Sequence, residues 1–248
     1  MPTTWPYPRV LAHRGGGALA PENTLAALET GARHGHTMVE FDVKLSADDV
    51  AYLLHDDTVN RTSDGTGESA EFTFAELSEL DAGSWFAPEF AGVRMPSFAR
   101  AAARCRELGL LANVEIKPNP GTDAATGRAV ALAAADLWSG AAVPPLLSSF
   151  SATALAAAAE AVPDQPRGML YERIPADWKT ETAALGCVSL HADHSELDEA
   201  LVATIRAAGL RILAYTVNDP ARARELASWG VDLVCTDRID TIGPGFLG

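Results

Sequence analysis

Residues 38–55, MVEFDVKLSADDVAYLLH, contain two runs with the composition of β-strands, Met38–Lys44 and Ala51–His55. Leu45–Asp49 join the two runs. A parallel crossover needs about a dozen residues or more, whereas an antiparallel hairpin needs only a few. The second run is therefore expected to return antiparallel along the first, as a hairpin arm rather than as a further strand of a parallel sheet.

Outside this hairpin, short β-branched or leucine-rich runs alternate with amphipathic helical segments. The remaining predicted strands are Arg9–His13, Leu111–Lys117, Leu146–Phe150, Gly168–Tyr171, Cys187–His191, Arg211–Val217 and Val231–Thr236. The predicted helices are Glu22–His34, Phe98–Leu108, Ala124–Trp138, Ala152–Ala161, Trp178–Leu185, Glu196–Ala208 and Ala221–Trp229. Such alternation implies a parallel sheet covered by helices. Nine strands are predicted in all, and without the hairpin arm eight remain, the number that an α/β fold of the (β/α)8 TIM-barrel type needs.

The strand count makes Ser46–Pro96 an insertion between the second barrel strand and its helix, beginning with the hairpin arm. It contains a helical pattern near Phe74–Leu80. No linker and no repeat of fixed period divides residues 1–248, so we expect a single barrel domain. The 248 residues, 48% hydrophobic and 21% charged, are enough for one large core and exclude wholesale disorder.

The chain is acidic, with 33 Asp and Glu residues against 19 Lys and Arg and a formal charge of −14. This charge argues against a nucleic acid or an anionic membrane as a partner, and at first sight against an anionic substrate. The three cysteines form no C-x-x-C pair, so neither a disulfide framework nor a cysteine zinc site is indicated. We find no signal peptide and no run of about 20 apolar residues, and expect a soluble, cytoplasmic protein without membrane insertion.

Three carboxylates are predicted to meet inside the barrel. Residues i and i+2 of a strand share a face, so Glu40 and Asp42 point together, as do Glu115 and Lys117. Charged groups inside a barrel are costly unless they are paired or bind a metal. Two like charges about 4 Å apart repel by roughly 4 kcal/mol at an effective dielectric of 20. The cluster therefore calls for a cation, and oxygen ligands favour Mg2+ or Ca2+ over zinc.

Each of these motifs has a more ordinary explanation when it stands alone. An E-x-D pair is usually a solvated strand face, an E-x-K pair can form its own ion pair, and a single histidine at a strand end is more often structural. The run Gly15–Gly17 is read as a flexible turn, although it follows a strand and precedes a helix, where its N–H groups could approach a phosphate. Taken together the motifs are more specific, because one barrel places them all at the same end.

The motifs also stand in a recognisable order along the chain. They are His13-Arg14-Gly15, Pro21-Glu22-Asn23-Thr24, Glu40-Phe41-Asp42, His55-Asp56, Glu115-Ile116-Lys117, Leu147–Phe150, Tyr215–Asn218 and Cys235–Asp237. This ordered set resembles the signature of the glycerophosphodiester phosphodiesterase family and covers most of the chain. Trp5–Arg9 and Asp81–Trp85 are similar to the cytosolic bacterial enzymes of the family that are associated with glycerol-3-phosphate uptake. The resemblance implies a TIM barrel of the phosphodiesterase type with an insertion after the second strand.

The resemblance further implies an enzyme of glycerol and lipid metabolism that hydrolyses glycerophosphodiesters to glycerol 3-phosphate and an alcohol. It implies one divalent cation, Mg2+ or Ca2+, with Glu40, Asp42 and Glu115 as its ligands. Glu22 would support Arg14 or bind substrate, and Tyr215 would pack on the glycerol moiety. The expected partner is thus a small-molecule diester.

By the same resemblance, His13 and His55 would be the general acid/base pair, and Arg14 and Lys117 would hold the phosphate. Histidine has an unperturbed pKa near 6.5 and can take or give a proton near neutrality. The sequence leaves open which histidine is the base, and whether water or the glycerol 2-hydroxyl attacks. A metal and two cationic side chains would make the site locally positive, so the overall acidity does not exclude a small phosphodiester.

Two other functions remain alternatives at this stage. A related phospholipase, sphingomyelinase D-like or specific for phosphatidylinositol, would need an apolar route for lipid chains, and no membrane-binding segment is evident. A non-catalytic phosphodiester-binding protein would not need both histidines and all three carboxylates. The alcohol leaving group and the oligomeric state stay open.

Overall fold

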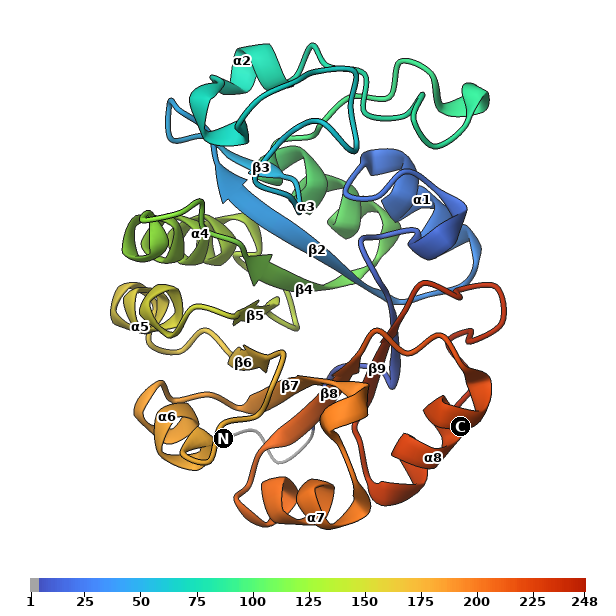
Figure 1. Ribbon diagram of the computed structural model, residues 1–248, viewed down its shortest axis with the longest axis vertical. Helices are drawn as coiled ribbons and strands as arrows, with labels where there is room; N and C mark the ends of the chain where they lie inside the picture. The colour runs from blue at the N-terminus through green and yellow to red at the C-terminus, as the bar shows by residue number, and fades with distance from the viewer. Residues whose placement is uncertain (1–4) are drawn as a thin grey trace.

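Eight parallel strands close into a barrel in the computed structural model, which describes residues 5–248 (Figure 1). The strands are β1 (Val10–Ala12), β2 (Met38–Leu45), β4 (Leu111–Ile116), β5 (Leu146–Ser149), β6 (Arg167–Tyr171), β7 (Ser189–Asp193), β8 (Arg211–Tyr215) and β9 (Leu233–Thr236). The order β1-β9-β8-β7-β6-β5-β4-β2 is closed by pairing of β1 with β2, where Ala12 faces Val39. Nearly every strand residue is buried, because helices cover the outside and side chains fill the inside. The predicted (β/α)8 barrel is confirmed.

Seven helices follow the barrel strands and surround them (Figure 1). They are α1 (Leu25–Arg33), α3 (Phe98–Leu108), α4 (Asp123–Leu137), α5 (Ala152–Ala161), α6 (Trp178–Ala184), α7 (Glu199–Ala207) and α8 (Pro220–Trp229). Two of them begin three residues later than predicted, because Thr24 and Asp198 act as N-caps whose side chains accept backbone N–H groups. The predicted strand Cys187–His191 likewise begins two residues too early.

The strand β3 (Ala51–Leu53) pairs antiparallel with β2, placing Lys44 opposite Tyr52. The segment that follows carries α2 (Phe74–Leu77), shorter than the helical pattern near Phe74–Leu80, and lies above the barrel (Figure 1). It also includes short 3-10 turns at Ser69–Glu71 and Pro88–Phe90. Further 3-10 turns lie at Gly17–Leu19 and His194–Glu196.

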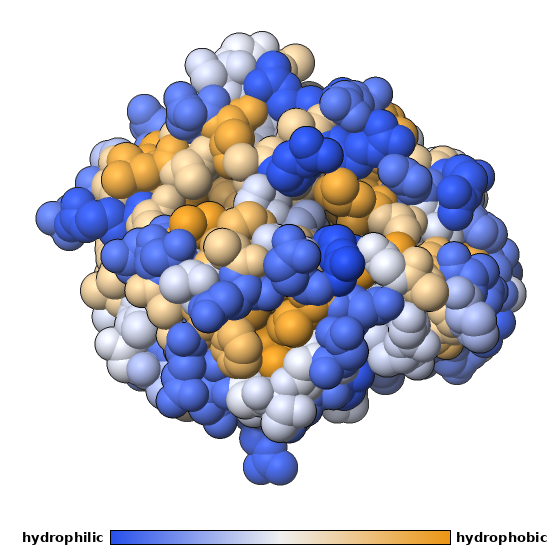
Figure 2. Space-filling view, turned by 90° about the horizontal axis from the view of Figure 1, so that it is seen from above, coloured by the Kyte–Doolittle hydropathy of each residue, from blue (hydrophilic) through white to orange (hydrophobic). Residues whose placement is uncertain are grey.

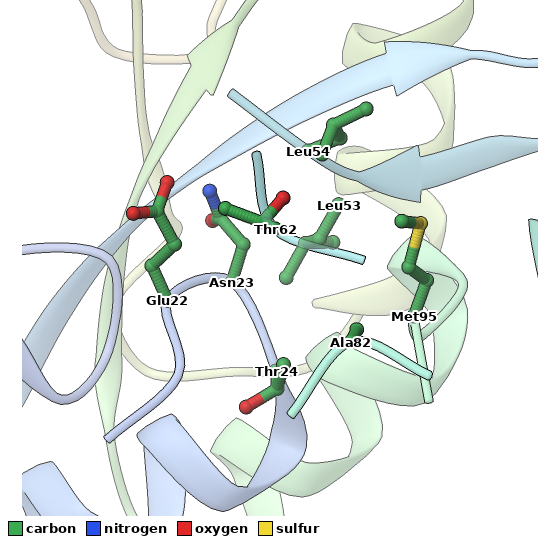
Figure 3. Close-up of a pocket in the computed structure, with 8 residues that line it drawn as sticks. All are labelled: Glu22, Asn23, Thr24, Leu53, Leu54, Thr62, Ala82 and Met95. Atoms are coloured by element: carbon green, nitrogen blue, oxygen red, sulfur yellow. The ribbon is translucent and has the colours of Figure 1, made fainter. Parts of the chain in front are cut away.

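The segment after β3 has a small hydrophobic cluster of its own, made of Tyr52, Leu54, Val59, Leu77, Ala82 and Met95. It packs on the loop that precedes α1, with a small cavity of about 10 Å³ between them. Figure 3 shows Glu22, Asn23 and Thr24 of that loop beside Leu53, Leu54 and Thr62. The loop after β1 and the segment after β3 therefore form one wall.

The barrel interior is apolar at one end and polar at the other. The apolar part is formed by Tyr7, Leu11, Met38, Leu146, Leu213, Leu233 and Cys235. The N-terminal segment closes this end, and the Tyr7 hydroxyl donates a hydrogen bond to the Pro144 carbonyl at 2.9 Å. Residues 1–4, the start of the segment in which we expected no signal peptide, lie outside the described residues.

The face seen from above carries hydrophilic residues with smaller hydrophobic patches scattered between them (Figure 2). Among residues 5–248, no helix combines the length and the apolar character needed to cross a bilayer.

Candidate active site

Three buried carboxylates meet at the polar end of the barrel. Glu40 and Asp42 lie on one face of β2, and Glu115 lies opposite Asp42 on the neighbouring strand β4. Ligand oxygens of the three lie within 4.8 Å of one another. The alternation of a β-strand is the local reason, since residues two apart share a face and the register of β2 and β4 brings the third acid alongside.

The electrostatics of this cluster favour the binding of a positive charge. Burial, and then the charges of Asp42 and Glu115, raise the pKa of Glu40 well above its usual range. Burial and Asp42 raise the pKa of Glu115 to about 7. Burial also acts against ionisation of Asp42, but Lys117 and Arg14 outweigh it and lower the pKa of Asp42 to about 2. Two of the three acids are thus held in a site that does not favour their charged form.

The donor set fits a hard divalent cation. Glu40 Oε1 is buried and has no hydrogen-bond partner among the described residues, so one carboxylate oxygen is free for a ligand. Three carboxylates suit Mg2+ or Ca2+. A second group, His13, Glu40 and Cys235, lies equally close, but burial raises the pKa of the Cys235 thiol well above its usual range. The thiol is therefore a poor ligand, and the all-oxygen set is the better candidate.

Asn23 holds Asp42 in place. Its side-chain amide donates to Asp42 Oδ2 at 2.8 Å, and its Oδ1 accepts the backbone N–H of Asp42 at 3.1 Å. Asn23 adopts a left-handed φ of 57°, a conformation that asparagine tolerates better than most residues. We did not single out Asn23 from the sequence, although it belongs to the Pro21–Thr24 motif.

Two cations flank the acids. Arg14 Nε lies 3.8 Å from Asp42 Oδ2, and the backbone N–H of Arg14 donates to Glu40 Oε2 at 2.9 Å. Lys117 Nζ lies 2.9 Å from Glu115 Oε1 and 3.7 Å from Asp42 Oδ1. Burial opposes the charge of Lys117, but Glu115 and Asp42 outweigh it and raise the pKa of the lysine. Both cations stay charged beside the acidic cluster.

Each of the two predicted histidines has a carboxylate partner. His13 Nδ1 lies 2.6 Å from Asp237 Oδ1, and Asn218 Nδ2 donates to the other oxygen of Asp237 at 2.9 Å. The remaining ring nitrogen of His13, Nε2, lies 3.9 Å from Glu40 Oε2. Asp237 thus orients the ring and leaves Nε2 facing the acidic cluster.

His55 is arranged in the same manner from another part of the chain. Its Nδ1 lies 2.8 Å from Asp56 Oδ1, and its Nε2 lies 3.0 Å from Lys117 Nζ. Since an ammonium can only donate, His55 Nε2 is the acceptor in that contact. Burial lowers the pKa of His55, although the charge of Asp42 acts in the opposite direction. Both predicted histidines therefore present Nε2 to the same region.

Arg61 connects this site to the segment after β3. It donates to both oxygens of Glu22 and to both oxygens of Asp56, at 2.7 to 2.9 Å. Glu22 in turn accepts from Arg14 at 2.6 Å. Burial favours the neutral form of Glu22, but Arg61 and Arg14 outweigh it and lower its pKa. Glu22 is therefore an ionised support for Arg14.

A cavity of about 170 Å³ brings the predicted residues together. It is lined by eight of the predicted residues, His13, Arg14, Glu40, Asp42, His55, Glu115, Lys117 and Tyr215. Glu22, the ninth, does not line it but accepts a hydrogen bond from Arg14. The Tyr215 ring packs edge-on against Phe150 with centroids 5.9 Å apart, and Lys117 Nζ lies 5.4 Å from the Phe150 centroid. The phenol of Tyr215 donates to the Tyr171 carbonyl at 2.8 Å, which leaves the ring face beside the cavity.

Gly17, the last residue of the glycine run after β1, has a structural role. The Gly17 N–H donates to the His13 carbonyl at 2.9 Å, and the next N–H, of Ala18, donates to the Asp237 carbonyl at 2.9 Å. A Cβ on Gly17, which has a φ of 53°, would lie 2.3 Å from that same carbonyl oxygen. The expectation that N–H groups of this run approach a phosphate does not hold for Gly17, because its N–H is already used.

Sequence reasoning missed four supporting residues, Asn23, Asp56, Arg61 and Asp237. Asp56 follows His55 directly and Asp237 directly follows the last strand, so both had a positional signal. No local pattern marks Arg61, whose role depends on contacts with Glu22, 39 residues away. Such contacts are visible only after folding.

Comparison with known proteins identifies the relatives of this arrangement. Residues 13–241 match the model of the glycerophosphoryl diester phosphodiesterase family. The chain is 30% identical over 238 residues to a glycerophosphodiester phosphodiesterase of Caldanaerobacter subterraneus, an alignment that covers 94% of this chain and 95% of that protein.

Solved structures agree with the family match. A phosphodiesterase of Oleispira antarctica, determined in complex with the product sn-glycerol 3-phosphate, superposes with a TM-score of 0.87 at 36% identity and covers 93% of both chains. A glycerophosphodiester phosphodiesterase of Agrobacterium tumefaciens superposes with a TM-score of 0.78 at 27% identity, over 97% of this chain and 98% of that one. The similarity thus extends over nearly the whole barrel.

Proposed function

Because the chain belongs to the glycerophosphoryl diester phosphodiesterase family, whose matched relatives are enzymes, we propose that it hydrolyses glycerophosphodiesters to glycerol 3-phosphate and an alcohol. One observation carries the proposal. A buried cluster of three carboxylates is flanked by two cations and by two histidines, each oriented by its own carboxylate. These are the groups that a metal-assisted attack on a phosphodiester requires.

Glu40, Asp42 and Glu115 would hold one divalent cation, Mg2+ or Ca2+. The cation, when bound, neutralises negative charge on the phosphoryl oxygens and so favours attack at phosphorus. The free oxygen of Glu40 and the raised pKa values of Glu40 and Glu115 support this assignment.

Arg14 and Lys117 would bind the phosphate on either side of the acids. Arg14 Nε and Lys117 Nζ lie 3.8 and 3.7 Å from the two different oxygens of Asp42, so the cations approach the cluster from two directions. A phosphodiester gains negative charge in the transition state, and two fixed cations stabilise it there. Glu22, ionised and bonded to Arg14, keeps the guanidinium in position.

His13 and His55 would act as the general acid/base pair. Each ring uses Nδ1 for an aspartate, so Nε2 is the atom that exchanges a proton with the substrate. One histidine would take the proton of the nucleophile, either water or the glycerol 2-hydroxyl, and the other would give a proton to the leaving alkoxide. Tyr215 would pack on the carbon chain of the glycerol moiety.

The test is an assay with purified protein, Mg2+ or Ca2+, and glycerophosphocholine. We expect glycerol 3-phosphate and choline as products. A panel that varies the alcohol and the metal, including intact phospholipid, defines the preferred substrate. Absence of turnover on every glycerophosphodiester with metal present contradicts the proposal, and faster turnover of intact lipid than of deacylated diester favours the phospholipase alternative.

A further inference from the structure

The same cavity is also lined by two polar residues to which no role is assigned above. Asn113 on β4 and His191 on β7 both line it, together with Leu170 and Leu213. Asn113 is 2% exposed and His191 is fully buried. Uncharged but polar side chains at such a depth need hydrogen-bond partners, because an unpaired polar atom in the interior is costly.

Each residue has one side-chain atom without a protein partner. Asn113 Nδ2 donates to the Ser148 hydroxyl at 3.0 Å, while its Oδ1 is unpaired among the described residues. His191 Nε2 lies 2.8 Å from the Ser189 hydroxyl, while its Nδ1 is unpaired in the same sense. These hydrogen bonds to Ser148 and Ser189 fix the two side chains, and each side chain keeps one hydrogen-bonding atom without a protein partner.

The depth of these residues matches the length of a glycerol moiety. Asn113 precedes Glu115 by two residues on the same face of β4 and lies opposite Glu40 in register. Two residues of strand correspond to about 6 to 7 Å. With the phosphate bound at Arg14 and Lys117, the attached carbon chain would extend past the acids. The hydroxyl furthest from phosphorus would then lie near Asn113 and His191.

The chemistry of the two free atoms selects an uncharged hydroxyl. Asn113 Oδ1 can only accept a hydrogen bond. Burial lowers the pKa of His191 to about 3, so the ring is neutral and offers Nδ1 as a donor or an acceptor, depending on its tautomer. A hydroxyl group can donate to the amide and also satisfy either tautomer of the ring. A second phosphate would face an acceptor and the neighbouring Glu40, and an apolar group would leave both atoms unpaired.

We propose that Asn113 and His191 bind the terminal hydroxyl of the glycerol moiety and thereby make the enzyme selective for glycerol among phosphodiesters. This inference rests on the proposed function and adds the part of the substrate that the deep end of the site recognises. Leu170 and Leu213, beside the two polar groups, contact the carbon chain.

The test uses two 4-nitrophenyl phosphodiesters that differ in one group, the ester of glycerol and the ester of propane-1,2-diol. The second lacks only the terminal hydroxyl and keeps the 2-hydroxyl, so it remains a substrate even if that hydroxyl attacks. We expect the wild-type enzyme to prefer the glycerol ester by about 100-fold in kcat/KM. His191→Leu and Asn113→Leu should each lower kcat/KM for the glycerol ester about tenfold or more and change that for the propanediol ester much less.

Controls separate recognition from general damage. Leu213→Met alters the apolar part of the same cavity and should affect the two esters alike. His191→Gln, which keeps a hydrogen-bonding group, should retain more of the preference than His191→Leu and covers the case in which the leucine variant does not fold. Mg2+ affinity should be the same in Asn113→Leu as in the wild type, because Asn113 is assigned to substrate and not to the metal.

Three results would overturn the inference. The first is that the wild type hydrolyses both esters at equal rates. The second is that the variants lose equal activity on both esters, as expected for residues that hold only water. The third is that Asn113→Leu binds Mg2+ more weakly than the wild type. If neither ester is hydrolysed, binding decides the inference alone, while the proposed function is still decided by the assay with glycerophosphocholine. Calorimetry with Mg2+ should then show tighter binding of glycerol 3-phosphate than of propane-1,2-diol 1-phosphate, and a difference that His191→Leu does not reduce contradicts the assignment.

Discussion

Arg61 donates two parallel hydrogen bonds, each 2.8 Å long, to the carboxylate of Glu22. This pair joins the segment after β3 to the loop after β1. The same guanidinium binds Asp56, which holds His55, while Glu22 holds Arg14. One side chain therefore sets the position of a proposed phosphate ligand relative to a proposed catalytic histidine. Planar bidentate pairing of this kind is a property of arginine that lysine does not share.

Arg61→Ala should lower kcat by about 10- to 100-fold, because Arg14 and His55 lose their common support. Arg61→Lys should rescue little of this loss, since one ammonium cannot bind two carboxylates side-on. The side chain is 45% exposed, so we expect a small change in melting temperature. Steady-state kinetics and thermal unfolding measure both effects. Arg128→Ala, which breaks an exposed ion pair with Glu160, is the matched control and should leave kcat unchanged.

Asp237→Asn should lower kcat by about 100-fold or more with a smaller effect on KM, because His13 loses the carboxylate that sets its tautomer and orientation. The pH profile of kcat should change in the same variant. Asp240→Asn, at an exposed aspartate paired with Arg238, serves as the control. A near-normal rate in Asp237→Asn would show that His13 does not need this partner.

Removal of divalent cations with a chelator should abolish activity, and added Mg2+ or Ca2+ should restore it. Cation affinity should also rise with pH. The pKa of Glu115 is raised to about 7 and that of Glu40 is raised well above its usual range, so protons occupy the ligands at low pH and compete with the metal. Between pH 6 and 8 we expect affinity to increase, by at most about tenfold per pH unit for each proton displaced. Calorimetric titration in buffers of different ionisation enthalpy measures affinity and proton release together.

Glu115→Gln should weaken cation binding strongly and flatten that pH dependence. It should not destabilise the metal-free protein, because the substitution removes like-charge repulsion from a buried cluster. Thermal unfolding in chelator tests this expectation against the wild type. A large loss of stability in the metal-free variant would mean that Glu115 serves mainly as the ion-pair partner of Lys117.

His13→Ala and His55→Ala should each lose the chemical step, by about 100-fold or more in kcat, while keeping the fold. Single-turnover kinetics separate this loss from effects on substrate binding. Near-normal turnover in either variant would remove that residue from the proposed acid/base pair.

The sequence alone was sufficient for the barrel and for the acidic cluster. Alternating β and α runs predict the parallel sheet, and the short loop before Ala51 predicts that β3 returns antiparallel along β2. The period of two places Glu40 beside Asp42, and Glu115 beside Lys117, on single faces. The two residues of each pair are close together in the chain, where backbone geometry decides which side chains share a face. Glu115 joins Asp42 because β2 and β4 are neighbours in the barrel.

Only the tertiary structure decided how the acidic cluster is supported and which polar atoms near it stay unpaired. His13 and Asp237 are 224 residues apart, and they meet because β1 and β9 are neighbours in the closed barrel. Arg61 joins Glu22 to Asp56 across the boundary between the loop after β1 and the segment after β3. The unpaired atoms of Asn113 and His191 are likewise defined by everything around them, since a polar atom is unpaired only once the rest of the chain has packed.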